Sequence, residues 1–122
     1  MSREKTPGKI VTYGKSHMDI VQAGVDAIKE VLFFGSEAEK ESMVFCLDRY
    51  LDPYFGYKLP CQNEIIALLQ ECLFRPNPTA LKEDILHMLG MYAACPLAVL
   101  EQRCCELEAE LQPEAKRIFS ER

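Results

Sequence analysis

Residues 28–33, IKEVLF, return 41 positions later as LQECLF at 69–74, and this repeat decides the predicted fold. Apolar residues beyond it align at the same spacing: Val44 with Ile85, Leu47 with Met88, and Leu51 with Tyr92. Ser36 likewise aligns with Asn77, and both are residue types that start helices. Because apolar residues recur every three or four positions through both stretches, each stretch predicts a pair of helices rather than strands.

Helix start and stop signals divide the rest of the chain. Ser36 and Glu39 form a capping box at the start of the second helix. Asn77 is the predicted N-cap of the fourth helix, with Pro78 in its first turn. No Asn-Gly or Asp-Gly pair marks a hairpin, and only residues 10–13 suggest a short strand. The predicted helices are 16–34, 36–51, 61–74, 78–93, 96–111 and 113–119.

The repeat resembles the HEAT and armadillo-like families, whose units are helix pairs with a period near 40 residues. The resemblance covers residues 17–120, with full pairs at 17–51 and 61–93 and a truncated pair at 96–120. It implies an all-α fold of five or six helices in stacked antiparallel pairs, a short solenoid in which the second helices form one layer. An irregular six-helix bundle is the alternative, since any stack of antiparallel helix pairs shares this pattern.

Charge and composition separate an arm from a body. Residues 1–15 carry four basic residues against one acidic residue, with two glycines and a proline, so we expect a flexible or extended basic arm. Residues 16–122 carry a net charge of −8, and their length suits one hydrophobic core, which predicts a single helical domain. The total net charge of −5 argues against direct binding of nucleic acid. No apolar run approaches a membrane span, and the first residues lack a secretory h-region, so we expect a cytoplasmic protein with no membrane contact.

Six cysteines in so short a chain need a physical explanation. Cys46, Cys72 and Cys104 fall on the apolar faces of predicted helices, where a free cysteine behaves as a small hydrophobic residue. Disulfides belong to exported proteins, and no export signal is present. We therefore expect reduced, non-catalytic thiols.

The search for catalytic chemistry finds no local motif. A zinc site would have to be assembled from distant side chains: His87, Cys95, Cys104 and Cys105. Neither a Cys-x-x-Cys nor a His-x-x-x-His spacing supports one. Cys61 and Cys95 begin predicted helices, where the helix dipole lowers a thiol pKa, but no base with a nucleophile signature accompanies them. Without a glycine-rich phosphate loop either, we predict no catalytic, cofactor or metal site, and no enzyme.

The connection at 52–60 is the segment that most suggests binding. It carries three aromatic residues and two prolines, and tyrosine is enriched at protein interfaces. The alternative is that Tyr54 and Phe55 fold back to fill the groove between the helix pairs. Acidic residues of the predicted second and fourth helices extend the surface, unless they form an ordinary solvated face. The candidate partner-binding residues are Glu41, Asp48, Asp52, Tyr54, Phe55, Tyr57, Glu83, Asp84 and His87.

A small, acidic, all-helical chain without a catalytic motif resembles the immunity proteins of bacterial toxin systems, including contact-dependent growth inhibition. Several of those families use HEAT-like stacks. The resemblance implies a protein-binding inhibitor that covers the active site of a basic toxin domain such as a nuclease. A cytoplasmic adaptor or scaffold that binds a peptide or protein is the second hypothesis, and a small enzyme or metal protein is the third.

Overall fold

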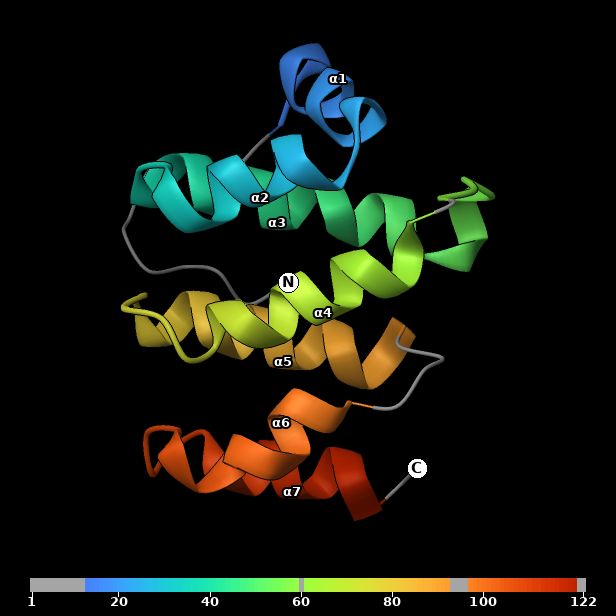
Figure 1. Cartoon of the computed structure of the whole chain (residues 1–122). Helices are drawn as coiled ribbons and strands as arrows, with labels where there is room; N and C mark the ends of the chain where they lie inside the picture. The colour runs from blue at the N-terminus through green and yellow to red at the C-terminus, as the bar shows by residue number, and fades with distance from the viewer. Residues whose placement is uncertain (1–12, 60, 93–96, 121–122) are drawn as a thin grey trace, which may run out of the picture. The chain divides into compact units, whose positions relative to one another are not determined.

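The structure is a computed structural model that describes residues 13–59, 61–92 and 97–120, with side chains up to Ile118 (Figure 1). These residues form helices joined by short connections and contain no strand, so the all-α prediction is confirmed. Most of the strand predicted at 10–13 lies outside the described residues. The elements are α1 (Lys15–Ala23), α2 (Val25–Phe34), α3 (Glu37–Leu51), η1 (Pro53–Phe55), α4 (Gln62–Cys72), α5 (Thr79–Tyr92), α6 (Ala98–Arg103), η2 (Cys104–Glu106) and α7 (Gln112–Ser120).

The chain divides into two compact units, Met1–Cys61 and Gln62–Arg122. We call them the first and the second unit. The single domain expected over 16–122 stays a prediction. No helix of the described residues combines the length and the apolar character that crossing a membrane requires.

In the first unit, α1, α2 and α3 contact one another. The predicted single helix at 16–34 is wrong, because the chain breaks at Gly24 into α1 and α2. Gly24 has φ 116° and ψ −177°, a backbone conformation that residues with a Cβ rarely adopt. The apolar stripe runs on across the break through Val21 and Ile28, both buried, so the pattern conceals the bend.

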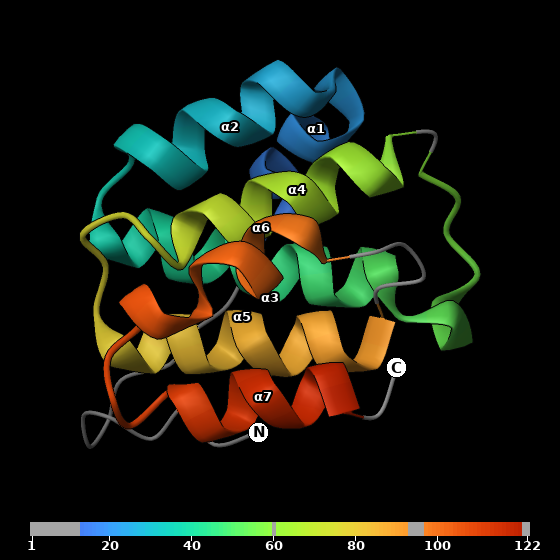
Figure 2. The same cartoon turned by 60° about the horizontal axis from the view of Figure 1, so that its bottom comes forward.

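In the second unit, α4 and α5 form an antiparallel hairpin, and α6 and α7 pack against it (Figure 2). α4 contacts α6 and α5 contacts α7, so the second helices of these two pairs lie in one layer. Within this unit the arrangement is the one expected of helix-pair repeats.

The predicted fifth helix at 96–111 is shorter in the structure. α6 ends at Arg103, and the chain continues as the 3₁₀ turn η2, whose end is closed by Leu107 N–H donating to Cys104 O at 3.2 Å. The Gln112 amide donates to the carbonyl of Leu107 at 2.9 Å and to that of Cys105 at 3.3 Å. These carbonyls are therefore satisfied by a side chain, and the helix does not need to continue.

Ser36 is the N-cap of α3, as predicted. Its hydroxyl accepts from Glu39 N–H at 3.2 Å, and the Glu39 carboxylate accepts from Ser36 N–H at 2.9 Å. α5 begins at Thr79, two residues after the predicted N-cap Asn77. The Asn77 side-chain amide donates backwards to Cys72 O at 2.9 Å, where α4 ends. Pro78 O instead accepts the first bonds of α5, from Leu81 and Lys82 N–H at 3.1 and 3.2 Å.

A buried glutamine ties α4 to the start of α6. Gln70 Oε1 accepts from Leu100 N–H at 3.0 Å, and Gln70 Nε2 donates to Ile66 O at 3.5 Å. The N-cap of α6, Leu97, has no side-chain oxygen to offer. Gln70 therefore satisfies a helix-end donor from a neighbouring helix.

Candidate functional site

Residues 52–59, here called the aromatic turn, leave the end of α3 and are held by local hydrogen bonds. Asp52 Oδ1 accepts from Tyr54 N–H at 2.9 Å, and Asp52 O accepts from Phe55 N–H at 3.2 Å. Gly56, with φ 71°, then closes the 3₁₀ turn by donating to Pro53 O at 3.2 Å. The left-handed conformation favours glycine at this position. The turn is thus a defined structure rather than a loose connection.

Arg49 braces the aromatic turn from the last part of α3. Its guanidinium carbon lies 4.5 Å from the centre of the Phe55 ring and 5.8 Å from that of Tyr13. Tyr13 in turn packs edge-on against Phe45, with ring centres 5.5 Å apart. Such contacts between a cation and a ring face are attractive in water and fix the ring positions.

The turn presents aromatic surface to solvent. Tyr54 is 87 % exposed, and Phe55 and Tyr57 are also exposed. Tyr54 and Phe55 meet edge to face at 5.2 Å between ring centres. The alternative in which Tyr54 and Phe55 fill a groove is therefore not what the structure has. A large aromatic ring held in water is a feature of surfaces that bind partners.

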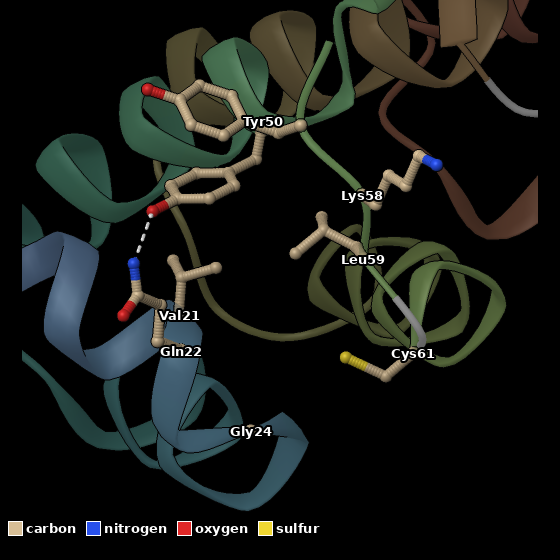
Figure 3. Close-up of a pocket in the computed structure, with 8 residues that line it drawn as sticks. Val21, Gln22, Gly24, Tyr50, Lys58, Leu59 and Cys61 are labelled. Carbon is tan, nitrogen blue, oxygen red and sulfur yellow. Dashed lines mark hydrogen bonds between the residues drawn. The ribbon is translucent and has the colours of Figure 1, made fainter.

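A pocket of about 480 Å³ lies behind the turn, within the first unit (Figure 3). Its walls come from α1, from the break after α1, from α3 and from the chain that follows the turn. The lining residues are Val21, Gln22, Gly24, Tyr50, Tyr57, Lys58, Leu59 and Cys61.

The Tyr50 and Tyr57 rings connect the pocket to the turn. Their centres are 4.4 Å apart and their planes differ by 34°. Tyr50 is only 5 % exposed, and its hydroxyl oxygen accepts a 3.5 Å hydrogen bond from Gln22 Nε2. Tyr57 is thus shared, with its ring in the pocket wall and part of it in the exposed aromatic surface.

The acidic candidates of the first unit do not form the exposed strip that the sequence suggests. Glu41 is only 5 % exposed, because the fifth position of α3 faces inward, so it contributes no exposed surface to a partner. Asp48 is half-buried, and Asp52 is half-buried and already caps the aromatic turn. Asp52 therefore acts first as a structural residue.

The remaining candidates, Glu83, Asp84 and His87, lie on α5 in the second unit. Glu83 and His87 are exposed and Asp84 is half-buried. Of the predicted partner-binding residues, the aromatic turn thus brings together four: Asp52, Tyr54, Phe55 and Tyr57.

The described cysteines are free thiols, with Cys46, Cys72 and Cys104 buried as predicted. Burial raises the pKa of the Cys46 thiol to about 11, against a smaller opposite effect of Arg49. Cys61 is half-buried and Cys105 exposed, while Cys95 lies outside the described residues. Among the described residues no three His, Cys, Asp or Glu side chains gather in a way that would hold a metal ion.

Sequence reasoning missed Arg49, Tyr50 and Gln22. Arg49 is exposed and looks like an ordinary surface cation, and Tyr50 occupies an apolar position that predicts a core residue. Only the tertiary structure brings Gln22 to Tyr50, 28 residues away. Comparison of the chain with protein-family models, curated proteins and solved structures finds no match.

Proposed function

We propose that this protein is a protein-binding module whose anchor is the aromatic turn. The observation that carries the proposal is Tyr54, 87 % exposed on a turn that Asp52, Gly56 and Arg49 hold in place. Aromatic side chains on a rigid support lose little conformational entropy on binding. Tyrosine is also enriched among the few residues that supply most of the binding energy in typical interfaces.

The negative net charge of the chain supports a basic partner, but it does not indicate which part of the chain makes the contact. Residues 16–61 carry eight acidic and four basic residues, and residues 62–122 carry ten and six, so both stretches are equally acidic. A negative net charge speeds encounter with a cationic protein. The exposed rings at 54, 55 and 57 then distinguish the first unit as the place where binding energy is concentrated.

For the partner, we propose a basic toxin domain that this chain neutralises by binding over its active site. The proposal rests on the acidic charge, the preformed helical support and the aromatic anchor. Direct contact with nucleic acid is not part of it, because the net charge is −5.

Photo-crosslinking tests the anchor. The full chain carries p-benzoylphenylalanine at position 54 and is irradiated in a lysate of the cells that encode it, and mass spectrometry identifies the adducts. The matched control places the same group at Met91, an apolar side chain of the second unit that is 59 % exposed. We expect one dominant partner at position 54 and none at position 91. Equal adducts at both positions would refute the anchor.

The identified partner then permits quantitative tests. Tyr54→Ala should weaken binding at least about tenfold by speeding dissociation, whereas Met91→Ala should leave it unchanged. Expression of the partner alone should arrest growth, and co-expression of this chain should restore it. A partner that is harmless when expressed alone would exclude the toxin-neutralising function while leaving protein binding intact.

A further inference from the structure

The pocket behind the aromatic turn has the properties of a small-molecule site, and the proposed protein-binding function shares only Tyr57 with it. It measures about 480 Å³, within the range of about 300–1,000 Å³ that small-molecule pockets occupy. A cavity of about 150 Å³ is enough for a benzene ring. The space therefore suits a fused or substituted ring rather than a single small group.

The polar chemistry of the pocket centres on Tyr50. Its side chain is almost fully buried, and Gln22 Nε2 donates to its hydroxyl oxygen at 3.5 Å. The Tyr50 O–H is thus left as a donor, with no acceptor among the described residues. A ligand that brings an acceptor oxygen would give this donor the hydrogen bond that it lacks within the described residues.

The charge of the pocket points to a neutral ligand. Among the described residues no carboxylate lines it, and Lys58 is the only cation that does. Figure 3 shows the Lys58 amine pointing away from Gln22 and Tyr50, whereas the Leu59 side chain and the Cys61 sulfur reach towards them. The remaining wall is apolar or aromatic, from Val21, Tyr50 and Tyr57.

We infer that this pocket binds a neutral, mainly apolar ring compound that accepts a hydrogen bond from the Tyr50 hydroxyl through a carbonyl or similar oxygen. The ring lies against Val21 and Leu59, and the acceptor oxygen faces Tyr50. The ligand class thus differs from the partner of the aromatic turn, and the two proposals stand independently.

A fluorescent probe of this class tests the inference. Prodan, 6-propionyl-2-(dimethylamino)naphthalene, is neutral, contains a fused ring and carries one ketone. Its emission shifts to the blue in apolar surroundings and to the red when its ketone accepts a hydrogen bond. Titration of the full chain should give saturable binding at one probe per chain with blue-shifted emission.

Two variants locate the probe. Tyr50→Phe keeps the ring and removes only the donor, so binding should weaken about three- to tenfold, and the emission of the bound probe should shift further to the blue. Leu59→Trp fills the pocket and should abolish binding. The matched control is Tyr54→Phe, which removes the same hydroxyl from an exposed ring outside the pocket and should change nothing.

Three outcomes would overturn the inference. Binding that does not saturate, or that survives Leu59→Trp, would place the probe elsewhere. Weaker binding in Tyr50→Phe without the additional blue shift would mean that the hydroxyl only supports the wall. If Tyr50→Phe unfolds, as circular dichroism would reveal, Leu59→Trp still decides whether this pocket is the site. Partner capture through position 54 is unaffected by any of these results.

Discussion

The hairpins α2–α3 and α4–α5 share an apolar pattern but are closed by different polar contacts. In the first, Ser36 caps the helix that follows it. In the second, the equivalent Asn77 bonds back to the helix that precedes it. The connection between α2 and α3 is only two residues long, whereas six residues join α4 to α5. The longer connection gives Asn77 room to reach Cys72, which shows that a polar residue at a repeated position can act on either of the helices it joins.

The same two hairpins bury opposite charges at one repeated position. Glu41 on α3 and Lys82 on α5 are 41 residues apart, and both are buried. Lys82 Nζ lies 3.0 Å from Glu108 Oε2 and 3.3 Å from Glu108 Oε1. A buried charge needs a partner of its own, so the two helix pairs are not interchangeable even where their apolar residues agree.

The largest effect should come from the shared apolar core. Ile28→Ala and Leu69→Ala remove fully buried side chains at equivalent positions. Each should lower the free energy of unfolding by about 2–5 kcal/mol. Urea denaturation followed by circular dichroism measures both. If either substitution lowered the free energy of unfolding by less than about 1 kcal/mol, the two positions would not be equivalent in the two cores.

The second-largest loss of stability should occur in the α4–α5 hairpin and not in the α2–α3 hairpin. Gln70→Ala leaves the buried Leu100 N–H without its acceptor and should cost about 1–3 kcal/mol. The matched control is Lys29→Ala, since Lys29 is exposed at the equivalent position and its removal should change stability by about 0.5 kcal/mol or less. Equal losses in the same urea titration would contradict the role of Gln70 as the cap of α6.

Substitution by aspartate should affect Ser36 and Asn77 differently. Asp is a good N-cap, so Ser36→Asp should change the unfolding free energy by about 0.5 kcal/mol or less. Asn77→Asp removes the amide that donates to Cys72 O and should cost about 1 kcal/mol. If Asn77→Asp proved neutral in thermal unfolding, the bond from Asn77 to Cys72 O would contribute nothing to stability.

The smallest effect is the pH dependence of the Lys82–Glu108 pair. A hydrogen bond from its own backbone N–H, and then the Lys82 ammonium, lower the pKa of Glu108. The stabilisation is therefore complete above the ordinary Glu pKa and is lost as the pH falls through the lowered value in the folded state. Its size is at most about 1 kcal/mol, because the Glu108 side chain is 36 % exposed and water screens the pair.

Unfolding midpoints between pH 7 and pH 3 test this sign. The difference between the natural chain and Glu108→Gln should be present at pH 7 and shrink below about pH 4.5. A difference that grows on acidification would show that the protonated carboxyl is the stabilising form.

The sequence patterns predicted most helices because apolar periodicity and prolines are local signals. α3 and α5 begin and end within about a residue of their predicted bounds. The break at Gly24 was not predicted, because Val21, Val25 and Ile28 keep the helical spacing across it. Apolar periodicity carries no information about the φ angle of a single residue. The bond from Asn77 back to α4 was not predicted, because the helix-capping propensity of asparagine does not specify which helix end its side chain contacts.

The candidate site was predictable only in part. The aromatic composition of 52–60 is visible in the sequence, but the contact of Arg49 with the Phe55 ring and the 87 % exposure of Tyr54 are not. Glu41 was expected at the surface because charged side chains rarely lie inside. The pocket joins residues near 22 to residues near 58, a pairing that no local pattern contains.

Each unit contains a buried cysteine whose alkylation rate reports how often the surrounding segment opens. Cys46 lies on α3 in the first unit and Cys72 on α4 in the second, and both are almost fully buried. Because the thiolate is the reactive form, alkylation at neutral pH must wait until the surrounding segment opens. The alkylation rate of each cysteine then converts to an opening free energy. Two rates measured in one sample would reveal whether the units open together or one before the other.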